Sequence, residues 1–238
     1  TAQQQTVTAT EETTSEPTAT EESTRPEPTV PELTPEEKIA EDKKDIEESP
    51  DKKFMEAMIK AGIFKGNSDG TFEPNISINR SEVAAVFYRV LGLPEPVMNP
   101  DTDPYSDVSK EAWYAGYIQE MKDMKFVSAK VTTYGPEVYS SKVEFLKFAM
   151  NVYKLLLPEE IEEIKAFESD LTNIKFDDVN EESWYAADMA AASAKGFLDG
   201  LGTECRKGTC FYANGSITRG NASQILYNMF AEILGVAE

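Results

Sequence analysis

The chain of 238 residues contains no histidine and only two cysteines, Cys205 and Cys210. The missing histidine excludes Ser-His-Asp and Cys-His hydrolysis, histidine-ligated zinc and histidine general bases. A structural zinc site takes four ligands, so two thiols alone cannot form one. These absences remove the commonest hydrolytic and zinc-based chemistries from consideration.

Positive charge is also scarce, because 23 lysines and arginines face 43 aspartates and glutamates, a formal net charge of −20. A nucleic-acid binder needs a basic face to neutralise phosphates, and an anionic membrane surface repels a chain of this charge. No run approaches the roughly 20 apolar residues of a membrane-spanning helix. Because the chain neither starts with Met nor shows a leader peptide, we expect a mature or trimmed product without membrane insertion.

Aromatic residues are absent before Phe54, and residues 1–50 carry 14 acidic but only 4 basic groups. A Thr-, Glu- and Pro-rich segment of this kind cannot bury enough apolar surface to offset its chain entropy. We expect residues 1–50 to form a disordered acidic stalk or linker, either plain or carrying O-linked sugars. Within it, the charged residues 36–49 predict at most a short, poorly anchored helix.

The remaining sequence contains an internal repeat. In three places a basic residue follows eight positions after an aromatic one: Phe72 and Arg80, Tyr134 and Lys142, Phe211 and Arg219. Each basic residue opens an apolar segment of helical period, and each is preceded by a good N-cap residue: Asn79, Ser141 and Thr218. Two longer strings also match, YSDVSKEAWYAGYI from Tyr105 and FDDVNEESWYAADM from Phe176. Each unit therefore predicts a helix, a loop and a second helix.

The basic residue at each second-helix start is placed unfavourably. It lies beside the positive end of the helix dipole, where a cation is destabilising. One interpretation is that the side chain and the helix terminus hold an anion together. The alternative is a surface residue whose aliphatic stem covers its neighbours.

The shared pattern resembles the S-layer homology domain. It is carried by GIFKGNSDGTFEPNISINRSE in the first unit, and by FDDVNEESWYAADMAAASAKGFLDG with the later ITR in the third. The resemblance implies an all-α fold in which three helix-loop-helix repeats pack as a pseudo-threefold bundle. The expected repeats span residues 51–93, 105–157 and 176–235.

The resemblance also implies a function without catalysis. Proteins of this family hold cell-wall glycans in grooves between repeats, commonly a secondary polysaccharide bearing pyruvate, and so anchor non-covalently outside the bacterium. We therefore expect no catalytic residue, cofactor or metal ligand, a location in the cell wall or S-layer, and a pyruvylated secondary polymer as partner. Two alternatives stay open: a structural protein that assembles with itself or an S-layer lattice, and a peptidoglycan-binding tether in a bacterium with two membranes. An enzyme with an attached anchor is disfavoured, because the repeats occupy the folded body.

Candidate glycan-binding residues come from the same resemblance: Arg80, Gly66, Asp107, Trp113, Lys142, Asp178, Trp184, Gly200 and Arg219. The aspartates have an alternative role as N-terminal caps, and the tryptophans have one as buried core. If each groove combines the basic residue of one unit with the Asp and Trp of the next, then Arg80, Gly66, Asp107 and Trp113 form the complete set.

Three equal sites are not expected, because each unit departs from the pattern. The first unit has Lys44 or Asp45 in the Asp region and Pro50 or Asp51 at the Trp position. In the second, Lys142 replaces arginine, while Lys125 and Ala129 replace glycine. In the third, Ala213 replaces proline, and Asn221 stands where Glu82 and Glu144 complete predicted capping boxes in the other two units. We expect Arg80 to contribute most to glycan binding, then Arg219, then Lys142.

The expected redox state of the two cysteines depends on where the protein is located. In an exported protein, Cys205 and Cys210 predict a short local disulfide, whereas in the cytosol they would be two free thiols.

Overall fold

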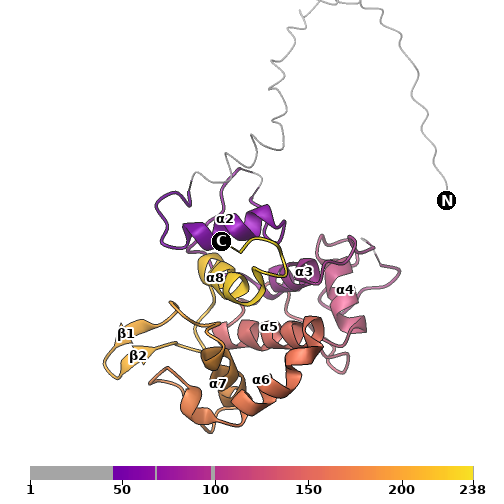
Figure 1. The fold of residues 1–238 in the computed structure, drawn as a ribbon. Coiled ribbons are helices and arrows are strands. Elements are labelled where there is room, and N and C mark those ends of the chain that lie inside the picture. The colour runs from indigo at the N-terminus through magenta and orange to yellow at the C-terminus, as the bar shows by residue number, and fades with distance from the viewer. Residues whose placement is uncertain (1–44, 68, 98–99, 238) are drawn as a thin grey trace, which may run out of the picture. The chain divides into compact units, whose positions relative to one another are not determined.

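The computed structural model of the protein describes residues 45–67, 69–97 and 100–237 (Figure 1). These residues are mostly helical, in agreement with the predicted all-α class. The helices are α2 (Lys52–Lys60), α3 (Arg80–Val90), α4 (Ala115–Asp123), α5 (Lys142–Leu156), α6 (Ile161–Glu168), α7 (Ala186–Ala194) and α8 (Arg219–Phe230), with short 3-10 turns η1 (Pro158–Glu160) and η2 (Leu171–Asn173). No helix in these ranges is long and apolar enough to cross a membrane.

The folded part starts earlier than predicted. The expected stalk, with its short helix, lies mostly in residues 1–44, outside the described residues, but residues 45–50 belong to the body. Ile46 is fully buried. The Asp45 carboxylate accepts hydrogen bonds from two loop amides of the first unit, at 2.9 and 2.6 Å. The boundary at residue 50 is therefore corrected: Ile46 is a lone apolar residue in a charged run, and its burial depends on partners far along the chain.

The second helix of each unit, α3, α5 or α8, starts at the predicted basic residue. Asn79, Ser141 and Thr218 precede these starts with extended backbone, and each side chain accepts from the amide three residues later. In α3 and α5 the glutamate at that position also accepts from the backbone amide of the cap residue. The predicted N-caps and both predicted capping boxes are thus confirmed.

The three segments before these helices bond to one another in a cycle. The amide of Ile78 donates to the carbonyl of Ile217, that of Ile217 to Ser140, and that of Ser140 to Ile78, at 3.0, 2.9 and 3.0 Å. Two further cyclic sets of bonds start from the first and second residue of each helix: the amides of Arg80, Lys142 and Arg219, and those of Ser81, Val143 and Gly220. These cyclic backbone bonds are called the central hub below.

The helices pack in the same cyclic order. The first helix of each unit packs on the second helix of the unit before it, so that α2 contacts α8, α4 contacts α3, and α7 contacts α5. In Figure 1, α5 lies in the middle of the described body between α8 and α7, and it also contacts α3. Phe87 of α3 packs against Phe145 of α5 at 4.8 Å between ring centres, and Tyr153 of α5 packs against Phe230 of α8 at 5.9 Å. One hydrophobic core thus joins the three units.

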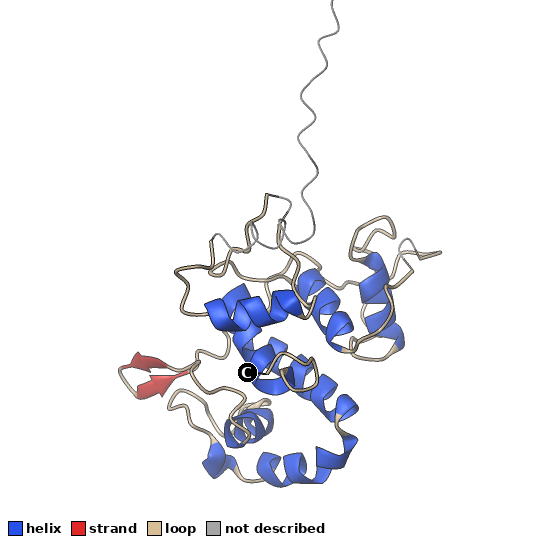
Figure 2. Cartoon of the chain, turned by 45° about the horizontal axis from the view of Figure 1, so that its top comes forward, coloured by secondary structure: helices blue, strands red, loops and turns tan. Residues whose placement is uncertain are grey.

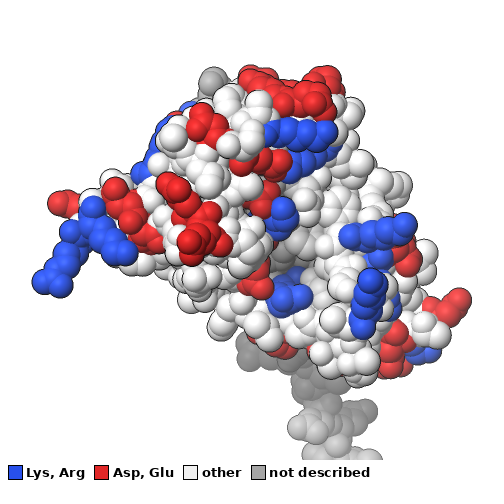
Figure 3. Space-filling view, turned by 90° about the horizontal axis from the view of Figure 1, so that it is seen from below, with Lys and Arg blue, Asp and Glu red and all other residues white. Residues whose placement is uncertain are grey.

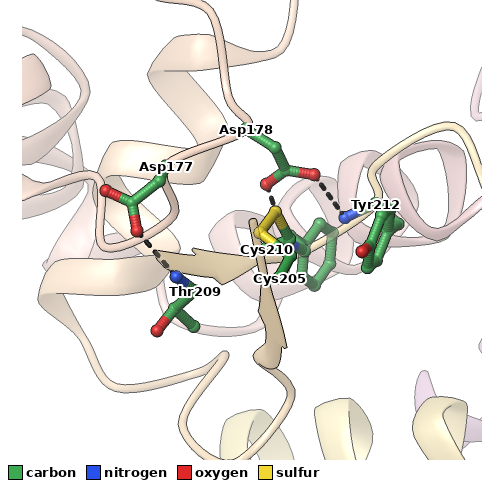
Figure 4. Close-up of a disulfide and its surroundings, with 7 residues drawn as sticks. Asp177, Asp178, Cys205, Thr209, Cys210 and Tyr212 are labelled. Carbon is green, nitrogen blue, oxygen red and sulfur yellow. Dashed lines mark hydrogen bonds between the residues drawn. A yellow bond between two sulfur atoms is a disulfide. The ribbon is translucent and has the colours of Figure 1, made fainter. Parts of the chain in front are cut away.

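A small hairpin is the exception to the helical fold in the described ranges. Strands β1 (Thr203–Cys205) and β2 (Gly208–Cys210) pair antiparallel and project away from the helices (Figure 2). The predicted disulfide between Cys205 and Cys210 closes the hairpin. Figure 4 shows how two adjacent aspartates hold its base: Asp177 accepts from the Thr209 amide at 2.7 Å, and Asp178 accepts from amides just beyond β2.

Candidate functional site

Each of the three basic residues lies over an aromatic ring of the next unit in the cycle. The distances from cation to ring centre are 5.0 Å for Arg80 over Tyr134, 5.3 Å for Lys142 over Phe211 and 4.7 Å for Arg219 over Phe72. These rings are the same three aromatic residues that precede the basic residues by eight positions, but each contact joins one unit to the next. The contact with the ring offsets part of the cost of placing a cation at a helix N-terminus.

A cavity of about 310 Å³ opens beside Arg80 and is called the Arg80 cavity. Its walls come from the loop and α5 of the second unit and from Trp184 of the third. The side chain of Arg80 is 37% exposed, and Glu144 lies 3.6 Å from it, beyond hydrogen-bond distance. Its Nε is buried and has no hydrogen-bond partner among the described residues, and the same holds for Nε of Arg219. Because Trp184 is 64% exposed, this cavity combines an under-used guanidinium with an accessible indole ring.

A second cavity, of about 360 Å³, opens beside Arg219 and is called the Arg219 cavity. It is lined by the loop of the first unit, by α3 and by the half-exposed Trp113. Arg219 is itself buried, with Nη1 3.2 Å from the Glu82 carboxylate and Nη2 donating to the Lys65 carbonyl at 2.9 Å. Burial lowers the pKa of Arg219, and Glu82 opposes this shift. This guanidinium is more fully engaged with the protein than that of Arg80.

The structure groups the candidate residues differently from the expected set. Arg80 shares its cavity with Trp184, whereas Trp113 shares one with Arg219. Gly66 lies between two lining residues of the Arg219 cavity, not beside Arg80. The reason is geometric: each basic side chain turns over the loop of the next unit, and the tryptophan on that cavity comes from the unit after it.

The third equivalent position, at Lys142, is built differently. Lys142 Nζ donates to the carbonyl of Phe211 at 3.0 Å, and burial lowers its pKa although Asp178 acts to raise it. The first unit has Pro50 or Asp51 in place of the tryptophan, and the Asp51 carboxylate packs so closely on Gly220 that an added Cβ would come within 2.2 Å. This position therefore offers neither a free cation nor an indole.

Gly200 has a packing role in the same region. Its φ is +82°, and a Cβ at this position would come within 2.4 Å of Nε2 of Gln224 in α8. That Nε2 donates to the carbonyl of Asp199 at 2.9 Å. The contacts of Gly200 explain why glycine stands there without any ligand.

The aspartates Asp107 and Asp178 hold loops. Asp107 accepts from the amides of Tyr134 and Gly135 at 2.8 and 2.7 Å. Asp178 accepts equally from the two residues that follow β2, and Asp45 does the same in the first unit. In each unit the second of these amides belongs to a residue with positive φ: Glu73, Gly135 and Tyr212. Both carboxylate oxygens are thus occupied by backbone, a contact with loop amides rather than the helix cap considered as the alternative.

The pKa of Asp107 reflects this arrangement. Burial acts to raise it, but the two loop amides and the Arg80 charge outweigh that effect and keep it below the ordinary value. The carboxylate therefore stays ionised and bound to its loop at neutral pH.

Charges on the body are distributed locally rather than as one patch. Figure 3 shows Lys and Arg side chains lying among Asp and Glu side chains on the face it draws, with several basic groups along a hollow in the middle. An anionic ligand would therefore meet individual cations and not a uniformly positive surface.

The described residues contain no cluster of three or more His, Cys, Asp or Glu side chains that could hold a metal ion.

Comparison with known proteins finds similarity in the folded part of the chain. Residues 44–84 match the family model of the S-layer homology domain. Exoglucanase XynX of Acetivibrio thermocellus is 25% identical over 186 residues, covering 78% of this chain and 16% of that protein. The surface-layer 125 kDa protein of Lysinibacillus sphaericus is 25% identical over 170 residues, covering 71% of this chain and 13% of that protein. Cell surface glycoprotein 1 of A. thermocellus is 30% identical over 115 residues, 48% of this chain and 5% of that protein.

The chain spans less than a fifth of the length of each of these relatives, the enzyme-named one included. The shared part supports a non-catalytic module with a role in anchoring at the cell surface. The match at residues 44–84 and the surface-layer relatives support an S-layer homology domain in this part of the chain, and the protein has its place at the cell wall or S-layer surface.

Proposed function

We propose that the body consists of three S-layer homology repeats and anchors the protein by binding an acidic, pyruvylated wall saccharide in the Arg80 and Arg219 cavities. The cyclic bonds of the central hub and the cyclic helix packing support the threefold arrangement, now starting at Asp45 rather than residue 51. The observation that carries the binding proposal is the pairing, in each cavity, of an arginine at a helix start with an exposed tryptophan.

The chemistry of the two cavities suits such a ligand. A guanidinium offers a planar fork of donors that matches a carboxylate, and the helix N-terminus adds a favourable dipole. An exposed indole provides a flat apolar face on which a sugar ring packs. Because Arg80 is more exposed and less engaged than Arg219, its cavity is the stronger candidate. The Lys142 position ranks last, since its ammonium is tied to a carbonyl and no indole faces it.

The net charge of −20 does not prevent binding of an anion. Screening over about 8 Å at physiological salt leaves a bound carboxylate sensitive mainly to the groups around it. Added salt should therefore speed association with the acidic chain, while the contact inside the cavity is changed less.

Calorimetric titration of a pyruvylated wall disaccharide tests the proposal. We expect Arg80→Ala to weaken binding about 10- to 100-fold, because a charge-assisted hydrogen bond contributes about 1.5–3 kcal/mol. Arg219→Ala should cost less and Lys142→Ala least. Lys207→Ala, on the hairpin and outside both cavities, is the matched control. If Lys142→Ala is the most damaging, or if no variant changes binding, the anchor residues are wrongly assigned.

A second candidate function is assembly with copies of the same chain or with an S-layer lattice, favoured by the surface-layer names of several relatives. Cosedimentation with wall sacculi, before and after removal of the secondary polymer, separates the two. Pelleting that disappears with the polymer supports glycan anchoring, whereas pelleting that depends only on protein concentration supports assembly. Equal binding of the unmodified disaccharide would instead favour a peptidoglycan tether.

A further inference from the structure

The two cavities occupy equivalent positions of the repeat, and several of their lining residues differ, among them one pair of positions that changes a charged contact. The first position lies on the second helix of a unit, five residues after the basic residue that starts it. It is Ala85 of α3, which lines the Arg219 cavity, and Lys147 of α5, which lines the Arg80 cavity. The second lies four residues after the tryptophan, and is Tyr117 in one case and Asp188 in the other. The chain thus carries two versions of the same construction.

In the Arg80 cavity the two residues of the pair contact each other. Lys147 Nζ donates to the two oxygens of Asp188 at 3.1 and 2.8 Å. The Asp188 side chain is only 4% exposed, whereas that of Lys147 is 43% exposed. A buried carboxylate without a partner is costly, so Asp188 fixes the ammonium in place. Because an ammonium has three donors, the exposed Lys147 keeps donor capacity for a molecule in the cavity it lines.

In the Arg219 cavity the same two positions do something else. Ala85 brings no charge, and the Tyr117 hydroxyl donates to Glu95 at 2.5 Å. Arg89 packs on the Tyr117 ring at 5.2 Å and donates to its hydroxyl. These contacts tie the tyrosine to the protein itself. Two further cations, Lys65 and Arg89, line the Arg219 cavity, but Arg89 is also bonded to the Ile63 carbonyl and Lys65 pairs with Glu95 at 3.3 Å. The Lys147–Asp188 pair therefore places a cation at a position where the Arg219 cavity has none.

We propose that Lys147, held by Asp188 as its positioning residue, is a second cationic contact that makes the Arg80 cavity selective for a saccharide with two negatively charged substituents. Arg80 binds one acidic group and Lys147 the other, on the adjoining sugar. The Arg219 cavity binds the singly charged saccharide without this preference. The inference rests on the proposed function and deepens it by distinguishing the two cavities.

Two probes test the selectivity: the pyruvylated wall disaccharide, and the same disaccharide with its second sugar oxidised to a uronate. Titrations use Trp113→Ala, which removes the exposed indole of the Arg219 cavity. In this background we expect the doubly charged probe to bind about tenfold more tightly than the singly charged one. Lys147→Met should abolish the preference and Lys147→Arg should retain part of it. Asp188→Asn should reduce it, because the ammonium loses its fixed position.

The paired exchange is the sharpest control. Lys147→Ala with Asp188→Tyr installs a combination that this chain already accommodates in the other cavity, and we expect it to fold and bind both probes equally. Ala85→Lys with Tyr117→Asp, in a Trp184→Ala background, should transfer the preference to the Arg219 cavity. A preference that survives Lys147→Met overturns this inference alone, as does equal binding of both probes before substitution. Failure of the pyruvylated disaccharide to bind the unsubstituted chain overturns the proposed function as well, whereas failure of the doubly charged probe alone overturns only this inference.

Discussion

The central hub and the two cavities follow opposite rules. In the hub, equivalent backbone bonds recur in all three units although the side chains around them differ: Ile78, Ser140 and Ile217 occupy one equivalent position. In the cavities, side chains that differ at equivalent positions give three different environments, at Arg80, Arg219 and Lys142. A backbone bond needs only an amide and a carbonyl, so sequence can vary there without loss. A binding site depends on particular side chains, so the same variation changes its chemistry.

Proline substitution in the hub provides the strongest test of this contrast. Ile78→Pro, Ser140→Pro and Ile217→Pro each remove one donor of the cyclic bonds and restrict the preceding residue. We expect each to lower the free energy of unfolding by about 3 kcal/mol or more, to a similar extent in the three units. Alanine at the same positions separates loss of the donor from loss of the side chain. Chemical denaturation measures this, and one harmless proline variant would show that the hub bonds are not equivalent.

The loop-holding aspartates should have the next largest effect. Asp178→Ala frees two amides that the half-buried carboxylate satisfies, and we expect it to cost about 2–3 kcal/mol. Truncation supplies a matched comparison in the first unit. Deletion of residues 1–44 should leave the melting temperature unchanged, whereas deletion of residues 1–45 removes Asp45 and should lower it. Equal melting temperatures for the two deletions would contradict a role for Asp45.

The pH dependence of Asp107→Ala tests the same contact. Because the folded pKa of Asp107 is lower than its ordinary 3.8, its contribution is fully present above that value and is lost as the pH falls through the folded pKa. The stability difference between Asp107→Ala and the unsubstituted protein should therefore be largest near neutral pH and shrink below about pH 4. A difference that is independent of pH would mean that the side chain acts through packing.

Local signals in the sequence were sufficient to predict where α3, α5 and α8 start. Asn79, Ser141 and Thr218 could be identified because an N-cap acts on amides only a few residues away. The disulfide could also be predicted, since its two cysteines lie five positions apart in the sequence. In contrast, the partner of each basic residue could not be predicted from spacing. Spacing within a unit does not reveal that Arg80 meets Trp184 rather than Trp113, because this depends on how the units are arranged around the hub.

Pairs that span two units were missed for the same reason. Lys147 looks like one more polar residue on α5, and Asp188 like a polar interruption of an alanine-rich helix. Only their contact in the folded structure shows that Lys147 and Asp188 form a pair. The one available signal was the comparison of equivalent positions, where Ala85 and Tyr117 stand in the other cavity. Comparison of equivalent positions did point to Lys44 or Asp45 as the match to Asp107, and the contacts of Asp45 with two loop amides decide between them.

The disulfide hairpin lies outside both the hub and the cavities and should affect stability alone. Replacing Cys205 and Cys210 by Ser removes a short closed loop, for which we expect a loss of about 2 kcal/mol. Neither cysteine lines a cavity, so saccharide affinity should be unchanged. Intact mass with and without alkylation establishes the oxidised state first. Two alkylatable thiols in the unreduced native protein would count against the disulfide and the extracellular location together.

The smallest expected effect concerns the end of the first helix in each unit. Gly62 and Gly196 end two of these helices with φ of +71° and +74°, and the second unit has Lys125 at φ +64° in the same role. A side chain in this left-handed conformation is strained, and glycine relieves the strain at some cost in chain entropy. We expect Lys125→Gly to raise the free energy of unfolding by about 0.5–1 kcal/mol. Lys130→Gly, in the loop that follows, is the control and should not stabilise. Lys125 lines neither cavity, but its neighbour Phe126 lines the Arg80 cavity, so a change in saccharide binding with Lys125→Gly would show that the end of α4 positions that cavity wall.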